Sequence, residues 1–113
     1  MKKTYFVLFF GKDNFFNEPP VFFNKKEAES FARKYRREII DYEYGGNEEL
    51  YYNDGWALDF AVFEKEDFLN NFSGHQIRNY CDEEFLKKHY TKDELKKYKN
   101  ELKNYFDLEE LEI

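Results

Sequence analysis

Cysteine, proline and glycine are all scarce in this sequence. It holds one Cys, two Pro and five Gly among 113 residues. The single thiol, Cys81, cannot form a disulfide within the chain, so stability has to come from packing, and a reducing cytoplasm is the expected location. The apolar run at residues 5–10 is six residues long, far short of the roughly 20 that span a bilayer. We therefore expect a soluble, cytoplasmic protein without a signal peptide.

Catalytic and metal-binding patterns are also missing. A metal site would have to recruit His75, Cys81 and His89, but their spacing matches neither a zinc-knuckle pair nor two His one helical turn apart. Cys81 is followed at once by the acids of residues 82–84, which oppose formation of its thiolate. The adjacent glycines at 45–46 have no phosphate-binding pattern around them. These absences predict a protein that is not an enzyme, with no catalytic residue, no metal and no cofactor.

Positive charge is in deficit, since 24 acidic side chains face 18 basic ones and the formal net charge is −6. The excess is concentrated in residues 45–84, which carry ten acids and two bases. A negative chain is soluble and resists loose association with nucleic acid or anionic membranes. The pattern predicts no membrane contact, and it predicts a local negative patch that would attract a partner with a basic surface.

Aromatic residues are abundant, with 14 Phe and 10 Tyr, and they supply enough apolar surface for one folded domain over residues 1–113. The run at residues 5–10 is apolar on both alternating faces, which predicts a central strand of a sheet. Turn-forming residues follow at 11–14. Residues 21–23, directly after two prolines, are predicted to form a second short strand.

A long amphipathic helix is predicted to begin at Lys25. Asn24 can cap it, and Glu27 lies three residues further on, as in a capping box. The apolar side chains recur at helical spacing, so one face should pack on a sheet; they are Ala28, Phe31, Ala32, Tyr35 and Ile39. The helix is expected to end within residues 41–44, because the glycines at 45–46 permit a turn.

The next segment has the pattern of a β-hairpin. Residues 50–52 and 56–63 are rich in strand-forming side chains and flank the turn sequence Asn53-Asp54-Gly55. In this arrangement the second strand places four side chains on one face, namely Trp56, Leu58, Phe60 and Val62. Residues 1–63 are thus predicted to be ββαββ, a small antiparallel sheet of about four strands with one helix packed on it.

Residues 64–113 are predicted to be helical, with two to three helices, which makes the whole chain α+β. A break is expected near Ser73-Gly74, and a helix over residues 82–90. Thr91 and Glu94 fit a capping box for a further helix that carries apolar residues as far as Phe106. For the tail at 107–113, the sequence leaves a helix, an edge strand and a docking segment open.

The candidate binding site lies in residues 41–56, where large aromatic side chains mix with Gly, Asn and acids. Tyr and Trp offer a wide contact area at low entropic cost, and this mixture is typical of protein-recognition loops. The predicted partner-binding residues are Tyr42, Tyr44, Glu48, Glu49, Tyr51, Tyr52, Asp54 and Trp56. The alternative is that Tyr51, Tyr52 and Trp56 simply pack the hairpin onto the sheet.

These features favour a non-enzymatic acidic binding protein that inhibits a partner by occupying its basic functional surface. The partner would be a protein, for example one that handles nucleic acid in a groove lined with Lys and Arg. In being short, acidic, rich in Tyr and Asn and free of catalytic motifs, the chain resembles phage-encoded inhibitors of bacterial defence, including anti-CRISPR proteins. An immunity protein that neutralises a bacterial toxin is the alternative in the same class.

Other functions remain open from the sequence. The predicted helix carries Arg33, Lys34, Arg36 and Arg37 beside Phe31 and Tyr35, a combination that a small nucleic-acid-binding protein could use. That function is disfavoured because both rings fall on the buried face and nearby acids can pair with the arginines. A minor enzyme or metal-dependent regulator built on His75, Cys81 and His89 ranks lower than the inhibitor. Ten tyrosines and the apolar residues of the tail also leave a homodimer open.

Overall fold

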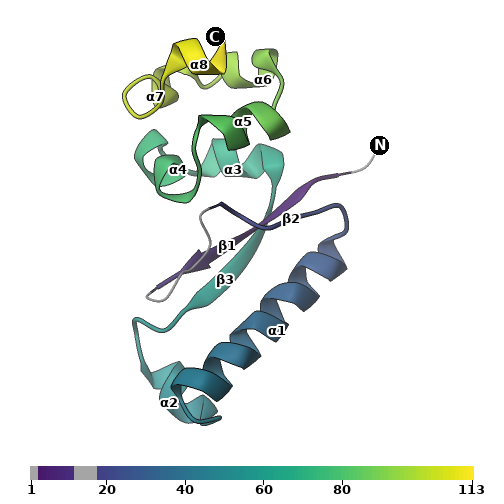
Figure 1. Cartoon of the computed structure of the whole chain (residues 1–113), viewed down its shortest axis with the longest axis vertical. Helices are drawn as coiled ribbons and strands as arrows, with labels where there is room; N and C mark the ends of the chain where they lie inside the picture. The colour runs from purple at the N-terminus through teal and green to yellow at the C-terminus, as the bar shows by residue number, and fades with distance from the viewer. Residues whose placement is uncertain (1–2, 12–17) are drawn as a thin grey trace. The chain divides into compact units, whose positions relative to one another are not determined.

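The computed structural model describes residues 3–11 and 18–113, which are divided between two compact units, Met1–Glu64 and Lys65–Ile113. The first unit contains a three-stranded antiparallel sheet with a long helix packed on it, and the second contains only short helices (Figure 1). The chain is therefore α+β, as predicted. The boundary between the units lies one residue from the one expected between the sheet and the helical portion.

Strand β1, Tyr5–Phe10, is the central strand of the sheet, which has the order β2-β1-β3. It pairs with β2, Val21–Phe22, on one side and with β3, Asp59–Glu64, on the other. All four residues from Phe6 to Phe9 are buried. The predicted central strand is confirmed, and its double-sided apolar pattern is explained by this burial. Beyond Gly11, the turn predicted at 11–14 lies outside the described residues.

Helix α1, Lys25–Glu43, begins and ends where the sequence predicts. The side-chain oxygen of Asn24 accepts a hydrogen bond of 3.2 Å from the backbone N–H of Glu27. The predicted apolar face is confirmed. The buried residues of this face are Ala28, Ala32 and Ile39. They pack in one core cluster with Val7, Phe9 and Leu58. After Glu43 the chain turns at two glycines with φ of 61° and 81°, a region that side chains rarely adopt.

The predicted hairpin is wrong, because residues 48–53 form a helix rather than a strand. Helix α2, Glu48–Asn53, lies beside the C-terminal end of α1 (Figure 1). Asn47 caps it by accepting a hydrogen bond of 3.2 Å from the backbone N–H of Leu50, and two glutamates in the first turn suit the positive end of the helix dipole. The first unit is ββααβ with three strands, not ββαββ with four.

Strand β3 starts at Asp59, three residues later than predicted. Its Phe60 and Val62 pack with the core under α1, together with the buried Leu58, so three of the four residues expected on one face share it. Trp56 does not join them, because it precedes the strand and is 76% exposed. The backbone N–H of Phe60 donates a hydrogen bond of 2.8 Å to the carboxylate of Asp59.

The second unit has six short helices where two to three were expected. They are α3, Lys65–Asn71; α4, Gly74–Tyr80; α5, Glu83–His89; α6, Lys92–Lys96; α7, Lys99–Leu102; and α8, Leu108–Leu111. The predicted helix over 82–90 is confirmed as α5, and the capping box of Thr91 and Glu94 is present at the start of α6. The predicted break near Ser73-Gly74 is confirmed, since α3 ends at Asn71 and α4 begins at Gly74. Ser73 also caps α4, through a capping box with Gln76.

The single helix expected from Thr91 to Phe106 is divided because the backbone tightens at several points, two of them at tyrosine residues. The N–H of Tyr98 donates to the carbonyl of Leu95, and that of Tyr105 donates to the carbonyl of Leu102, both three residues back instead of four. Leu102 is nevertheless fully buried. The tail, left open by the sequence, forms α8. Within the described residues, no helix has the length and apolarity needed to cross a membrane.

Candidate protein-binding site

The predicted partner-binding residues come together in the first unit, on the end of α1, on α2 and on the segment that leads to β3. Tyr42, Tyr52 and Trp56 are 88%, 64% and 76% exposed. Glu48 and Glu49 are exposed as well, and Tyr44 and Asp54 are half-buried. Three large rings are thus open to solvent, so that packing onto the sheet does not account for them.

Tyr51 is the exception among the predicted residues, because its side chain is buried. Its hydroxyl donates a hydrogen bond to the carbonyl of Leu58, and its ring meets Tyr44 edge-on with the ring centres 5.6 Å apart. Burial raises the pKa of Tyr51 to about 12, and the nearby carboxylate of Asp59 adds to this effect. The structure therefore gives Tyr51 the role of anchoring α2, not of offering a ring to a partner.

Asp54 fixes the backbone segment that leads to Trp56. One of its carboxylate oxygens accepts a hydrogen bond of 2.8 Å from the hydroxyl of Tyr44, and the other accepts one of 3.0 Å from the backbone N–H of Trp56. The second bond is an Asx turn, which fixes the backbone two residues after the aspartate. Although the ring of Trp56 is exposed, the backbone that carries it is fixed to the end of α1.

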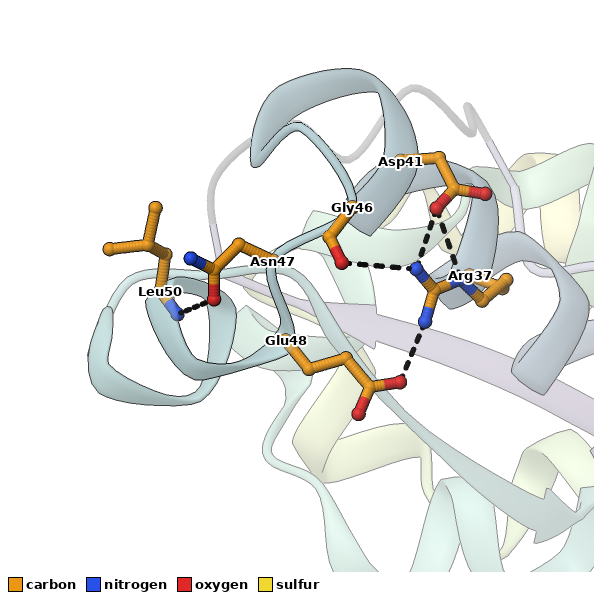
Figure 2. Close-up of polar contacts among 6 residues, drawn as sticks. All are labelled: Arg37, Asp41, Gly46, Asn47, Glu48 and Leu50. Carbon is orange, nitrogen blue, oxygen red and sulfur yellow. Dashed lines mark hydrogen bonds and ion pairs between the residues drawn. The ribbon is translucent and has the colours of Figure 1, made fainter.

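Arg37 links the end of α1 to α2 and to the turn between them through its guanidinium. Figure 2 shows it between the carboxylates of Asp41 and Glu48, each at 2.6 Å, with the carbonyl of Gly46 at 3.4 Å. The hydrogen bond to Asp41 is the main reason why the pKa of Arg37 is raised. Two carboxylates expected to contribute to a negative patch are therefore paired with a cation.

Comparison with known proteins adds nothing to this geometry. The chain matches no protein family model, no curated protein and no solved structure.

A surface cleft of about 350 Å³ lies next to two of the exposed rings. The described residues that line it are Phe10, Gly11, Tyr51, Tyr52, Asp54, Gly55, Trp56, Ala57 and Asp59. Only two of these are charged, and both are aspartates. We refer to it below as the Tyr52–Trp56 cleft.

Sequence reasoning missed Asp59 and Gly11 as members of this cleft. Gly11 has a φ of 95°, and a Cβ atom there would lie 2.5 Å from the carbonyl oxygen of Ala57. The end of β1 can therefore approach the segment that carries Trp56 only because residue 11 has no side chain. A glycine directly after an apolar strand could have indicated this close approach. Asp59 was not recognised because the predicted strand at 56–63 placed it in the strand interior.

The negative charge is spread more evenly than the sequence suggested. The acid-rich segment at 45–84 is divided between the two units, and each unit carries nine basic and twelve acidic side chains. The local negative character of the candidate site comes from Glu49 and from the aspartates of the cleft, of which Asp59 lies 3.5 Å from the guanidinium of Arg36. Among the described residues, the side chain of Glu49 has no hydrogen-bond or ion-pair partner.

The residues of the other candidate functions have contacts of their own. Phe31 packs against Phe22 at 5.2 Å and Tyr35 against Phe9 at 5.0 Å, between ring centres, so both rings are turned toward the sheet. Of the four basic residues considered for nucleic-acid binding, three lie within ion-pair distance of acids: Arg33, Arg36 and Arg37.

The proposed metal ligands do not meet in the structure. The Cys81 thiol is buried, with its sulfur 3.5 Å from the carbonyl of Ile77, and the ring of His75 lies against Tyr105 while that of His89 lies against Phe85. Among the residues the structure describes, no three His, Cys, Asp or Glu side chains are grouped as a metal site requires.

Proposed function

We propose that this chain is a non-enzymatic binding protein that inhibits a partner protein by covering the partner's basic functional surface. The observation that carries the proposal is the Tyr52–Trp56 cleft, where two exposed rings border a hollow whose charged described residues are both acidic. Trp and Tyr are the residues on which binding energy concentrates at protein interfaces. Leaving such rings in water has a cost, which binding to a partner would recover.

The proposed partner is a protein that handles nucleic acid, such as a component of a bacterial defence system. Its groove for DNA or RNA would be lined with Lys and Arg, and the net charge of −6 on this chain would speed the encounter. Inhibition follows if the cleft and its rings occupy the groove. On this proposal the chain acts in the cytoplasm, as a phage-encoded inhibitor comparable in type to anti-CRISPR proteins.

A protein partner accounts for the observations better than a nucleic acid does. The rings that could stack on bases along the basic helix, Phe31 and Tyr35, take part in the packing around the core. The rings that are exposed, Tyr52 and Trp56, lie with aspartates that would repel phosphate. An immunity protein against a basic toxin would use the same surface, and genes neighbouring this one would distinguish the two cases.

The test is affinity capture from a bacterial lysate with the native chain and with the double variant Tyr52→Ala/Trp56→Ala. Tyr51 is left unchanged because its burial makes it structural. Loss of two true hot-spot rings should raise the Kd by about thirtyfold or more, equivalent to about 2 kcal/mol. The matched control is Phe23→Ala, since Phe23 is 62% exposed and does not line the cleft.

The captured protein is then purified and tested for competition with its own nucleic acid. We expect the native chain to displace DNA or RNA from it, and the double variant to fail although it melts at the same temperature. Equal capture by the native chain and the double variant, with both folded, would contradict the proposal.

A further inference from the structure

We propose that the Tyr52–Trp56 cleft receives one arginine side chain of the partner. The guanidinium would stack on the rings of Tyr52 and Trp56 and pair with the carboxylate of Asp59. This inference rests on the proposed function, because it names the chemical group by which the partner's basic surface is recognised.

The size of the cleft fits one long side chain. Its volume of about 350 Å³ is at the lower end of the range, about 300 to 1,000 Å³, found for sites that hold small ligands. A guanidinium and its methylene stem can enter such a space, while the rest of the partner stays outside. The exposed rims of Tyr52 and Trp56 would then contact the surface around the arginine.

The rings that line the cleft are suited to a cation. The faces of Trp and Tyr rings carry negative electrostatic potential and attract Lys and especially Arg. Tyr52 is held edge-on to the buried Tyr51 with ring centres 4.9 Å apart, and the backbone of Trp56 is held by Asp54. The Tyr52 ring and the backbone that carries Trp56 are therefore restricted in position before a partner arrives, which lowers the entropic cost of binding.

Asp59 is the carboxylate with capacity left for a ligand. Both oxygens of Asp54 already accept hydrogen bonds, from Tyr44 and from Trp56. In Asp59, one oxygen accepts from the backbone N–H of Phe60 and lies 3.5 Å from the guanidinium of Arg36. The second oxygen of Asp59 has no hydrogen-bond partner within the described ranges 3–11 and 18–113.

Other ligand classes fit this cleft less well. Phosphate or carboxylate would meet two aspartates and, among the described lining residues, no Lys or Arg. An apolar side chain would bury the second oxygen of Asp59 without giving it a hydrogen-bond donor. Lysine shares the charge, but its compact ammonium is strongly hydrated and cannot stack as a planar guanidinium does.

The same combination of groups already occurs within the chain. The guanidinium of Arg36 lies 4.9 Å from the centre of the Phe60 ring and within ion-pair distance of Asp59. Arg78 lies 5.2 Å from the centre of the Phe106 ring and pairs with Glu83 at 3.0 Å. An arginine between an aromatic face and a carboxylate is thus an arrangement that this protein uses to hold itself together, and we infer the same arrangement for the partner.

The chain's single Trp makes the test direct, because Trp56 provides the only indole N–H signal in a nuclear magnetic resonance spectrum. The probe is the blocked peptide acetyl-Gly-Gly-Arg-Gly-Gly-amide, and the matched control peptide has citrulline, which has the shape of arginine but no charge. We expect the arginine peptide to shift the indole signal saturably and citrulline to leave it in place. A lysine peptide should bind more weakly than the arginine peptide.

Two variants connect the signal to the cleft. Asp59→Asn keeps an oxygen that can accept from the Phe60 N–H but removes the charge, and should raise the Kd of the arginine peptide about tenfold. Phe23→Ala, outside the cleft, should leave the Kd unchanged. An equal response to citrulline, or no saturable response to arginine up to the solubility limit of the peptide, would overturn the inference.

Failure of this inference can be told apart from failure of the proposed function. If the arginine peptide does not bind but capture of the partner still depends on Tyr52 and Trp56, only the inference that the cleft receives an arginine is wrong. If the peptide binds but the double variant captures the partner as well as the native chain does, the proposed function is wrong and the cleft remains a site for guanidinium groups.

Discussion

The hydroxyl of Tyr44, which is the residue that caps the end of α1, donates a hydrogen bond of 2.8 Å to the carboxylate of Asp54, which follows α2. Ten residues separate the two along the chain, and between them lies all of α2. The same carboxylate accepts from the backbone of Trp56. The position of the exposed tryptophan is therefore coupled to the end of the long helix through one aspartate.

Tyr44→Phe is expected to weaken this coupling. The substitution keeps the ring and removes only the hydroxyl, so a half-buried carboxylate loses one partner, at a cost of about 1 to 2 kcal/mol in the free energy of unfolding. Urea denaturation followed by circular dichroism measures the loss. Tyr42→Phe is the matched control, because the Tyr42 side chain is almost fully exposed and should contribute nothing measurable. Equal stability of the two variants would mean that the bond from Tyr44 is not formed in solution.

Arg37→Gln should destabilise the first unit in a salt-dependent way. The guanidinium joins α1 to α2 through Asp41 and Glu48, but all three side chains are exposed to solvent, so the effect should be smaller than that of Tyr44→Phe. Salt screens exposed ion pairs, and the difference from the native chain should therefore shrink in concentrated sodium chloride. Thermal melts at low and high salt measure it. Arg33→Gln, which loses one longer contact to Glu29, should change the melting temperature less.

Stability is expected to fall in alkaline solution because of Tyr51. Its pKa is about 12 in the folded chain and 10.0 in the reference state, so the folded state holds the proton more tightly. The corresponding stabilisation is complete below pH 10.0 and is lost as the pH rises toward about 12. Urea denaturation across this range should show the decline, and Tyr51→Phe should show less of it. Burial also raises the pKa of Tyr90, and the difference between native and variant curves removes that shared contribution.

Gly74→Ala should strongly destabilise the second unit. A Cβ atom at this position, the first residue of α4, would lie 2.0 Å from the carbonyl oxygen of Glu101, which is backbone and cannot rotate away. Such overpacking costs about 2 kcal/mol or more. The control is Gly55→Ala, where a Cβ atom would meet nothing within 4 Å. If both variants unfold at the same urea concentration, the close approach between α4 and α7 does not exist.

Local signals in the sequence were enough to predict the elements of the first unit that depend on neighbouring residues. The cap at Asn24, the apolar face of α1 and the glycine turn after it each follow from a short pattern, and each is present. The central place of β1 followed from its continuous apolar run. These elements are determined by local hydrogen bonding and by periodicity, which a single sequence shows directly.

The errors occurred where two local preferences competed. Leu50, Tyr51 and Tyr52 favour a strand by composition, but the cap at Asn47 and burial of the Tyr51 ring favour a helix, and the tertiary contact prevails. Asn53-Asp54-Gly55 looked like a hairpin turn, whereas Asp54 in fact turns the backbone toward Trp56. Asn47 followed by two glutamates was the signal that could have corrected the prediction.

The candidate site was predictable in composition but not in geometry. The mixture of rings and acids in residues 41–56 located the region, and the exposure of Tyr42, Tyr52 and Trp56 agrees with it. The pairing of Glu48 with Arg37 and the entry of Asp59 into the cleft depend on how α1, α2 and β3 meet. Contacts between segments that are far apart in the sequence cannot be inferred from local spacing. The sequence therefore predicted the residue types of the site but not its geometry.

The hydrogen bond from the Phe60 N–H to Asp59 also bears on the solution behaviour of an aromatic-rich chain. Strand β3 is an outer strand of the sheet, and an outer strand with open amide groups can recruit further copies into growing fibrils. At Phe60 the backbone N–H already donates to the carboxylate of Asp59, a side chain of its own strand, and is therefore not open to an incoming backbone. A charged residue at the start of an outer strand is one way in which proteins discourage pairing between edges, so we expect Asp59 to hinder self-polymerisation at this end of β3.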